Sequence, residues 1–128
     1  MPPKNTSGTP DGIHELLKKA TTEMLVLFLL RQKPMYTYEL MTTVERLSDG
    51  RLAFNTLYQV IYRLQNFGYI IESKRVVSEE NRVRLYFSVT ESGSAYLDAL
   101  IAQYHATIEA INHVLSLDHR AAEEGSNG

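Results

Sequence analysis

The chain has 128 residues, of which 44% are hydrophobic and 22% charged, with a formal net charge of −2 and no cysteine. This length is enough for one hydrophobic core and too short for two conventional domains. The absence of cysteine excludes disulfides, thiolate zinc sites and thiol redox sensing. The acidic balance argues against a generally basic nucleic-acid-binding protein, so such a function would require a local excess of positive charge.

Charge is distributed unevenly along the sequence. Residues 51–90 contain six Lys or Arg and three Glu, a net charge of +3. Residues 91–128 contain one Arg and six acidic side chains, a net charge of −5. A positive field confined to residues 51–90 is suited to docking on phosphates.

The first predicted element is a helix that follows a disordered arm. Residues 1–12 contain three prolines and two glycines, and we expect them to lack a fixed structure. The helix begins at Ile13 or at Thr22 and ends near Gln32, because the residue before Pro34 disfavours the helical region. Residues 24–30 are apolar on every side, but this run is too short for a membrane span, which needs about 20 residues. It must be covered by its own domain and by something else.

Two shorter helices are predicted next. The first spans residues 37–47 and ends before the turn signal Asp49-Gly50. The second spans residues 55–67, with Asn55 as its N-cap. Apolar side chains recur in it at spacings of three and four and share one face: Leu57, Val60, Ile61, Leu64 and Phe67. The opposite face is rich in amide, hydroxyl and arginine groups.

A β-hairpin is predicted after Gly68. Its strands cover about residues 69–77 and 82–89, joined by a turn at residues 78–81. In the second strand, alternate side chains point to opposite faces. The apolar set is Val83, Leu85, Phe87 and Val89, and the polar set is Arg82, Arg84, Tyr86 and Ser88. A short amphipathic helix followed by a basic hairpin is the order of elements of a winged helix.

The last element is predicted to be one long helix over residues 91–117, followed by a disordered tail at 118–128. Its apolar positions are spaced close to a coiled-coil seam: Leu97, Leu100, Ile101, Tyr104, Ile108, Ile111 and Leu115. A small domain cannot cover such a stripe alone, so we expect it to pair with a second subunit. The sequence thus predicts a mainly α protein with a small β-hairpin: residues 13–90 form a winged helix-turn-helix, and the C-terminal helix forms a dimer.

Several runs resemble the PadR family of bacterial transcriptional regulators. They are PMYTYEL at residues 34–40, NTLY at 55–58, RL at 63–64, GYI at 68–70 and RLYFSVTESG at 84–93. The likeness covers about residues 21–115, and the single C-terminal helix resembles the short-chain subfamily. The resemblance implies a dimeric winged helix-turn-helix repressor. It also implies an effector, since some relatives release DNA when a phenolic acid or a flat, apolar compound binds near the dimer interface.

Two features depart from the family pattern. Thr37 stands where a glycine is usual, and Ala53 replaces the usual Ser-type cap. The chain also lacks tryptophan, so an effector pocket cannot be built on stacked indoles.

We expect the polar face of the third helix and the basic face of the hairpin to contact DNA, rather than to be ordinary solvated surfaces. The candidate residues are Thr56, Tyr58, Gln59, Tyr62, Arg63, Asn66, Lys74, Arg82 and Arg84. Gln59 can bind adenine through two hydrogen bonds, and Arg63, one turn later, is expected to hold a phosphate. Arg82 and Arg84 are expected at phosphates or in the minor groove.

The dimer interface is expected to add Met24 and Phe28 to the C-terminal seam. Met24, Phe28 and Tyr104 form a candidate ligand pocket, although such residues are more often plain core. His105, Glu109 and His113 recur every four residues, as in some metal sites, but a solvated or interface face explains them better. No metal or cofactor is expected.

These features predict a cytoplasmic homodimeric regulator, a repressor on a pseudo-palindromic operator. Its partners would be double-stranded DNA, a second copy of the chain and a small aromatic effector, with no membrane. The alternative is a winged-helix module for protein–protein assembly without DNA binding. An enzyme is not expected, because the sequence offers no nucleophile with a base, no paired buried carboxylates and no phosphate loop.

Overall fold

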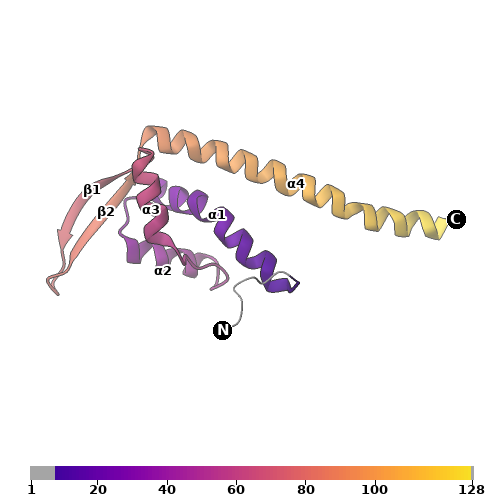
Figure 1. The fold of residues 1–128 in the computed structure, drawn as a ribbon, viewed down its shortest axis with the longest axis horizontal. Coiled ribbons are helices and arrows are strands. Elements are labelled where there is room, and N and C mark those ends of the chain that lie inside the picture. Colours follow the sequence, from indigo (N-terminus) through magenta and orange to yellow (C-terminus); the bar gives the residue numbers. More distant parts are fainter. Residues whose placement is uncertain (1–7, 128) are drawn as a thin grey trace. The chain divides into compact units, whose positions relative to one another are not determined.

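The computed structural model describes residues 8–127, with side chains up to Leu117. The elements are α1 (Pro10–Gln32), α2 (Thr37–Leu47), α3 (Leu57–Asn66), β1 (Ile70–Val77), β2 (Val83–Val89) and α4 (Glu91–Asn127), as drawn in Figure 1. The predicted fold class, mainly helical with a two-stranded antiparallel hairpin and a long last helix, is confirmed. The chain divides into one unit that ends at Leu97 and a second that begins at Asp98.

Helix α1 is longer than predicted and has no break. It begins at Pro10, inside the segment expected to be disordered; residues 1–7 of that segment lie outside the described residues. Proline is favourable in the first helical turn because the N–H groups there have no intrahelical acceptor. The helix therefore does not begin at Thr22, and the hydroxyls of Thr21 and Thr22 donate back to the carbonyls of Leu17 and Lys18 at 2.7 Å.

The core of the first unit is formed by apolar side chains of all its helices and of both strands. The largest fully buried ones are Val26, Leu27, Leu40, Leu64, Ile70 and Leu97. The apolar run in α1 is covered on one side only: Val26, Leu27, Leu29 and Leu30 are buried, whereas Phe28 is 42% exposed.

The end of α3 places the hairpin directly beside this helix. The N–H of Gly68 donates to the carbonyl of Gln65, and the N–H of Tyr69 donates to that of Leu64, both at 2.9 Å. This is a Schellman motif, which needs a left-handed residue; Gly68 supplies it with φ of 76°. The chain therefore turns without a linker from α3 into β1. At the other end of α3, the sequence suggested Asn55 as the N-cap. In the structure the N-cap is Thr56.

The hairpin forms the wing. Val77 pairs with Val83 beside the turn and Ile70 pairs with Val89 at the base, with a bulge between Glu72 and Lys74. Beyond the prediction, the wing is also anchored to the segment before α2. Met35 exchanges two backbone hydrogen bonds with Phe87, at 2.9 and 3.2 Å.

The start of α4 is hydrogen-bonded to the segment that ends α3. The Thr90 hydroxyl accepts a hydrogen bond from the N–H of Gly93 at 3.0 Å and donates to the carbonyl of Gly68 at 2.6 Å. The helix runs to Asn127, so it includes most of the tail that was expected to be disordered beyond Leu117; Gly128 lies outside the described residues. None of the helices in the described part of the chain has the length and hydrophobicity to cross a membrane.

Candidate nucleic-acid interface

The polar face of α3 is exposed as the residue periodicity predicts. Leu57, Val60, Ile61 and Leu64 are buried, which turns Thr56, Gln59 and Asn66 to the surface. Two tyrosines one turn apart are the large aromatic side chains of this face: Tyr58 is 76% exposed and Tyr62 is 68% exposed. Amide and phenol groups on one helix face can form hydrogen bonds with base edges or phosphates.

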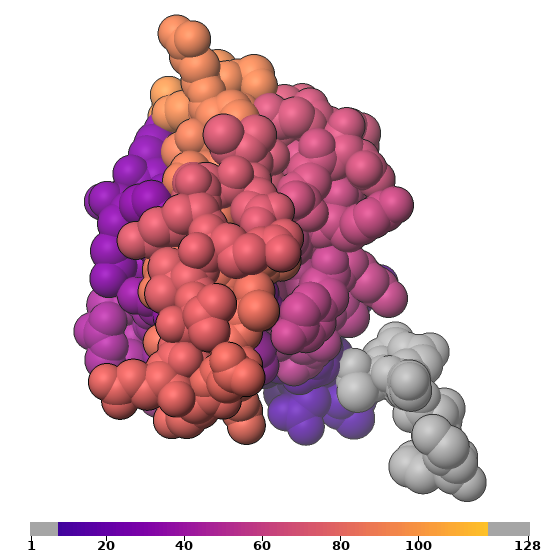
Figure 2. All heavy atoms as spheres, turned by 90° about the vertical axis from the view of Figure 1, so that its left-hand side faces the viewer, coloured from indigo at the N-terminus to yellow at the C-terminus, as the bar shows by residue number. Residues whose placement is uncertain are grey.

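The wing and α3 lie side by side. Figure 2 looks at the hairpin, and its side chains and those of the segment carrying α3 form adjacent parts of one surface. The hairpin and the segment carrying α3 are therefore neighbouring parts of the face of the first unit that Figure 2 shows.

Two of the wing cations lie over tyrosine rings. The Lys74 ammonium is 4.5 Å from the ring centroid of Tyr86, and the Arg84 guanidinium carbon is 4.7 Å from that of Tyr36. The two rings meet edge to face, with centroids 5.3 Å apart. Cations within about 6 Å of a ring centroid are attracted by the negative ring face. Tyr36, which precedes α2, was not among the residues singled out from the sequence; only its contact with β2 across the fold reveals it.

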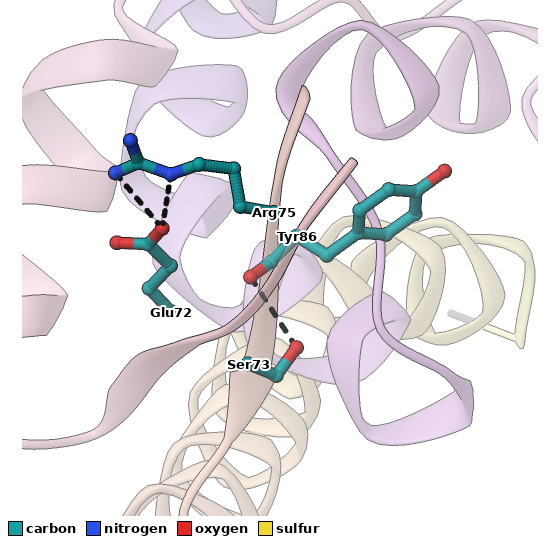
Figure 3. Close-up of polar contacts among 4 residues, drawn as sticks. All are labelled: Glu72, Ser73, Arg75 and Tyr86. Atoms are coloured by element: carbon teal, nitrogen blue, oxygen red, sulfur yellow. Dashed lines mark hydrogen bonds and ion pairs between the residues drawn. The ribbon is translucent and has the colours of Figure 1, made fainter. Parts of the chain in front are cut away.

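The two remaining wing arginines differ in their surroundings. Arg82 closes the turn with its backbone, since its N–H donates to the hydroxyl of Ser78, and its side chain is exposed. Arg75 donates from Nε and Nη2 to Glu72 Oε1, both at 3.4 Å. Figure 3 shows this pair on one side of the hairpin and the Tyr86 ring on the other. Arg75 is thus locally neutralised and lies on the opposite side from the Tyr86 ring.

Arg63 lies in a different environment from the one expected. Its Nε donates to Glu23 Oε1 of α1 at 2.7 Å, and the other oxygen of Glu23 accepts from the Tyr96 hydroxyl of α4 at 3.0 Å. The ring of Tyr96 stacks on that of Tyr69, with centroids 4.3 Å apart. Burial of Tyr96, together with its hydrogen bond to the Glu23 carboxylate, raises the pKa of its hydroxyl.

The described residues contain no cluster of three His, Cys, Asp or Glu side chains placed to hold a metal ion. The surface consists of a helix with exposed hydrogen-bonding side chains beside a hairpin that carries cations. A helix-turn-helix followed by such a wing defines a winged-helix DNA-binding domain of a transcriptional regulator.

The comparison with protein families agrees with this class. The model of the Transcriptional regulator PadR-like family matches residues 26–99, and the chain belongs to this family. The resemblance noted in the sequence is thereby confirmed, and the protein is a DNA-binding transcriptional regulator and not an enzyme. Family membership favours DNA binding over the alternative of a pure protein–protein module. The comparison with curated proteins found no significant match.

Solved structures show the same fold. A PadR family transcriptional regulator from Eggerthella lenta has a TM-score of 0.71 and 27% identity, over 82% of this chain and 90% of that one. A transcriptional regulator from Clostridium thermocellum has a TM-score of 0.67 and 26% identity, over 76% and 95%. A PadR-like regulator from Bacillus cereus, at 22% identity and a TM-score of 0.64 over 78% and 96%, supports the fold alone.

Proposed function

We propose that the chain acts as a homodimeric repressor on a pseudo-palindromic operator. Each α3 enters a major groove, and the half-sites are one helical turn apart, about 34 Å. The observation that supports this proposal is the exposed polar face of α3, together with the wing cations Lys74 and Arg84 that lie over tyrosine rings.

The proposed DNA contacts divide by chemistry. Gln59 binds a base edge, because a side-chain amide matches the donor and acceptor of adenine. Thr56 and Tyr58 lie at the N-terminal end of α3, where the backbone N–H groups attract phosphate. Tyr62 and Asn66 continue the same face toward its C-terminal end, while Lys74, Arg82 and Arg84 neutralise phosphates beside the groove.

The proposed dimer uses apolar surface that is left exposed in both units. In the first unit, Phe28 is exposed and Met24 is half-buried. In the second unit, large apolar side chains of α4 remain exposed; they are Tyr104, Ile111, Val114, Leu115 and Leu117. A second copy of the chain would cover these residues together with the half-buried Leu100, Ile101 and Ile108. Leu97 is excluded from this surface, because it is completely buried within one subunit.

A small aromatic effector would act through the same dimer. Bound against the exposed rings of Phe28 or Tyr104, it would favour a dimer in which the two copies of α3 are wrongly spaced for the operator. It can shift that equilibrium only by as much as its affinity differs between the two arrangements.

The decisive experiment combines Leu100→Asp with Ile108→Asp. Charges placed in an apolar seam without partners cost several kcal/mol, so sedimentation should show monomers and a gel shift should show loss of operator binding. The matched control is Ala102→Asp with Ala106→Asp, which adds the same charges on the opposite, exposed face of the helix. A stable dimer of the first variant, or a monomer that still binds the full operator tightly, contradicts the proposal.

A further inference from the structure

A single carboxylate connects three helices of the first unit. Glu23 of α1 accepts hydrogen bonds from Arg63 of α3 at 2.7 Å and from Tyr96 of α4 at 3.0 Å. Arg63 and Glu23 are 40 positions apart in the sequence, so this pair joins separate elements. By contrast, the pairs Arg75–Glu72 and Lys18–Glu15 join residues of the same strand or helix.

We infer that Arg63 serves DNA recognition as a positioning residue that acts through Glu23, and not as a phosphate ligand. The inference rests on the proposed role of α3 as the recognition helix. The two Glu23 hydrogen bonds hold α3 at a defined orientation to α1 and to the first turns of α4, and this orientation presents Gln59 and its neighbours to the groove.

The electrostatics of the pair support this role. A carboxylate in direct contact with the guanidinium cancels most of its field at a distance, so Arg63 attracts a phosphate less than an unpaired arginine would. Arg63 is also in the last turn of α3, at the negative end of the helix dipole. A cation is stabilised at this end of the helix, whereas a phosphate is attracted to the opposite end, the N-terminus.

The geometry explains why Glu23 is a suitable anchor. Its side chain is 23% exposed, and each carboxylate oxygen has a donor, so the carboxylate is held from two sides. Charge-assisted hydrogen bonds of this kind are shorter and more directional than neutral ones. The stacking of Tyr96 on Tyr69 fixes the second donor, and Tyr69 directly follows the glycine that ends α3.

The two roles of Arg63 predict effects of opposite sign for Glu23→Ala. This variant removes a negative charge near the DNA and releases Arg63, so a phosphate-ligand role predicts equal or tighter binding. A positioning role predicts that affinity for a specific duplex falls by about tenfold, while affinity for random-sequence duplex changes little. The specific probe is a duplex that the wild-type protein selects from a random-sequence pool.

A double-mutant cycle completes the test. Arg63→Ala should cause the same fall as Glu23→Ala, the double variant should cause no further fall, and the salt dependence of binding should keep its wild-type slope. Glu15→Ala is the matched control, since it removes a carboxylate of the same helix whose ion pair, with Lys18, is local. Thermal unfolding of every variant separates loss of orientation from loss of fold.

A charge exchange gives an independent readout if the alanine variants do not fold. Glu23→Arg combined with Arg63→Glu restores the ion pair between α1 and α3 but not the acceptor of the Tyr96 hydroxyl, so specific binding should return in part. A phosphate ligand replaced by a carboxylate would instead repel DNA. The inference is overturned if Arg63→Ala lowers the salt slope by about 1.8, which corresponds to one phosphate per subunit of the homodimer, and weakens specific and random duplex equally. If the wild-type protein shows no preference for any duplex, the proposed function fails, and this inference fails with it.

Discussion

Replacing Arg82 and Arg84 with alanine tests whether the wing binds phosphates. Arg82 has an exposed side chain next to the turn, and Arg84 is held over the ring of Tyr36 at 4.7 Å. Neither has an acidic partner among the ion pairs found in the described residues. Both charges are therefore available to the DNA backbone.

The magnitude follows from counterion release. Each neutralised phosphate contributes about 0.9 to the slope of log affinity against log salt, and the proposed homodimer carries four of these arginines, so the double variant should lower the slope by about 3.6. Between about 50 and 200 mM salt, the ratio of wild-type to variant affinity should then shrink by about 150-fold. The loss should be the same for specific and random duplex, because phosphates carry no sequence information.

The assay is a salt titration of duplex binding for the wild type, the double variant and Arg75→Ala. Arg75 is a matched control on the same wing, because it is paired with Glu72 on the opposite side from Tyr86 (Figure 3). Its removal should leave the slope almost unchanged. An unchanged slope for the double variant would refute a DNA-binding role of the wing.

Five further variants test four individual contacts. Gln59→Ala should cost about 1–3 kcal/mol per half-site on the specific duplex and almost nothing on random duplex in a gel shift; equal losses would mean that Gln59 binds only the backbone. Tyr86→Leu should weaken duplex binding several-fold by releasing Lys74, whereas Tyr86→Phe, which keeps the ring, should bind like the wild type. Gly93→Ala should lower the melting temperature although alanine favours helices, because its Cβ would lie 2.0 Å from the carbonyl oxygen of Tyr69; an unchanged melting temperature would refute that contact. The pKa of the Tyr96 hydroxyl is raised above its ordinary 10.0, so this group ionises at lower pH in the unfolded chain than in the folded one, and the free energy of unfolding falls as pH rises beyond 10. Tyr96→Phe should therefore lose less stability than the wild type over this pH range, as measured by unfolding at alkaline pH.

The amino-acid sequence alone determined the local elements and the family. The three- and four-residue spacing in α3 predicted the burial of Leu57, Val60, Ile61 and Leu64 and the exposure of the opposite face, because a helix has 3.6 residues per turn. Phe67 was wrongly placed on the buried face: it follows the end of the helix and is 61% exposed. The alternation in β2 predicted the hairpin, and Gly68 marked the turn between them. Signals of this kind act over a few residues and need no knowledge of packing. They were weaker at helix ends, where α1 begins at Pro10 and the N-cap of α3 is Thr56.

Only the tertiary structure decided which side chains work together. Tyr36 lies beside Arg84 because Met35 pairs with Phe87, and Arg63 meets Glu23 because α1 and α3 share a core. Leu97 fits the seam spacing of α4 but is buried in its own subunit, since the first turns of this helix pack on the domain. Such contacts join positions far apart in the sequence, and no local pattern encodes them, because they depend on how the elements pack around one core.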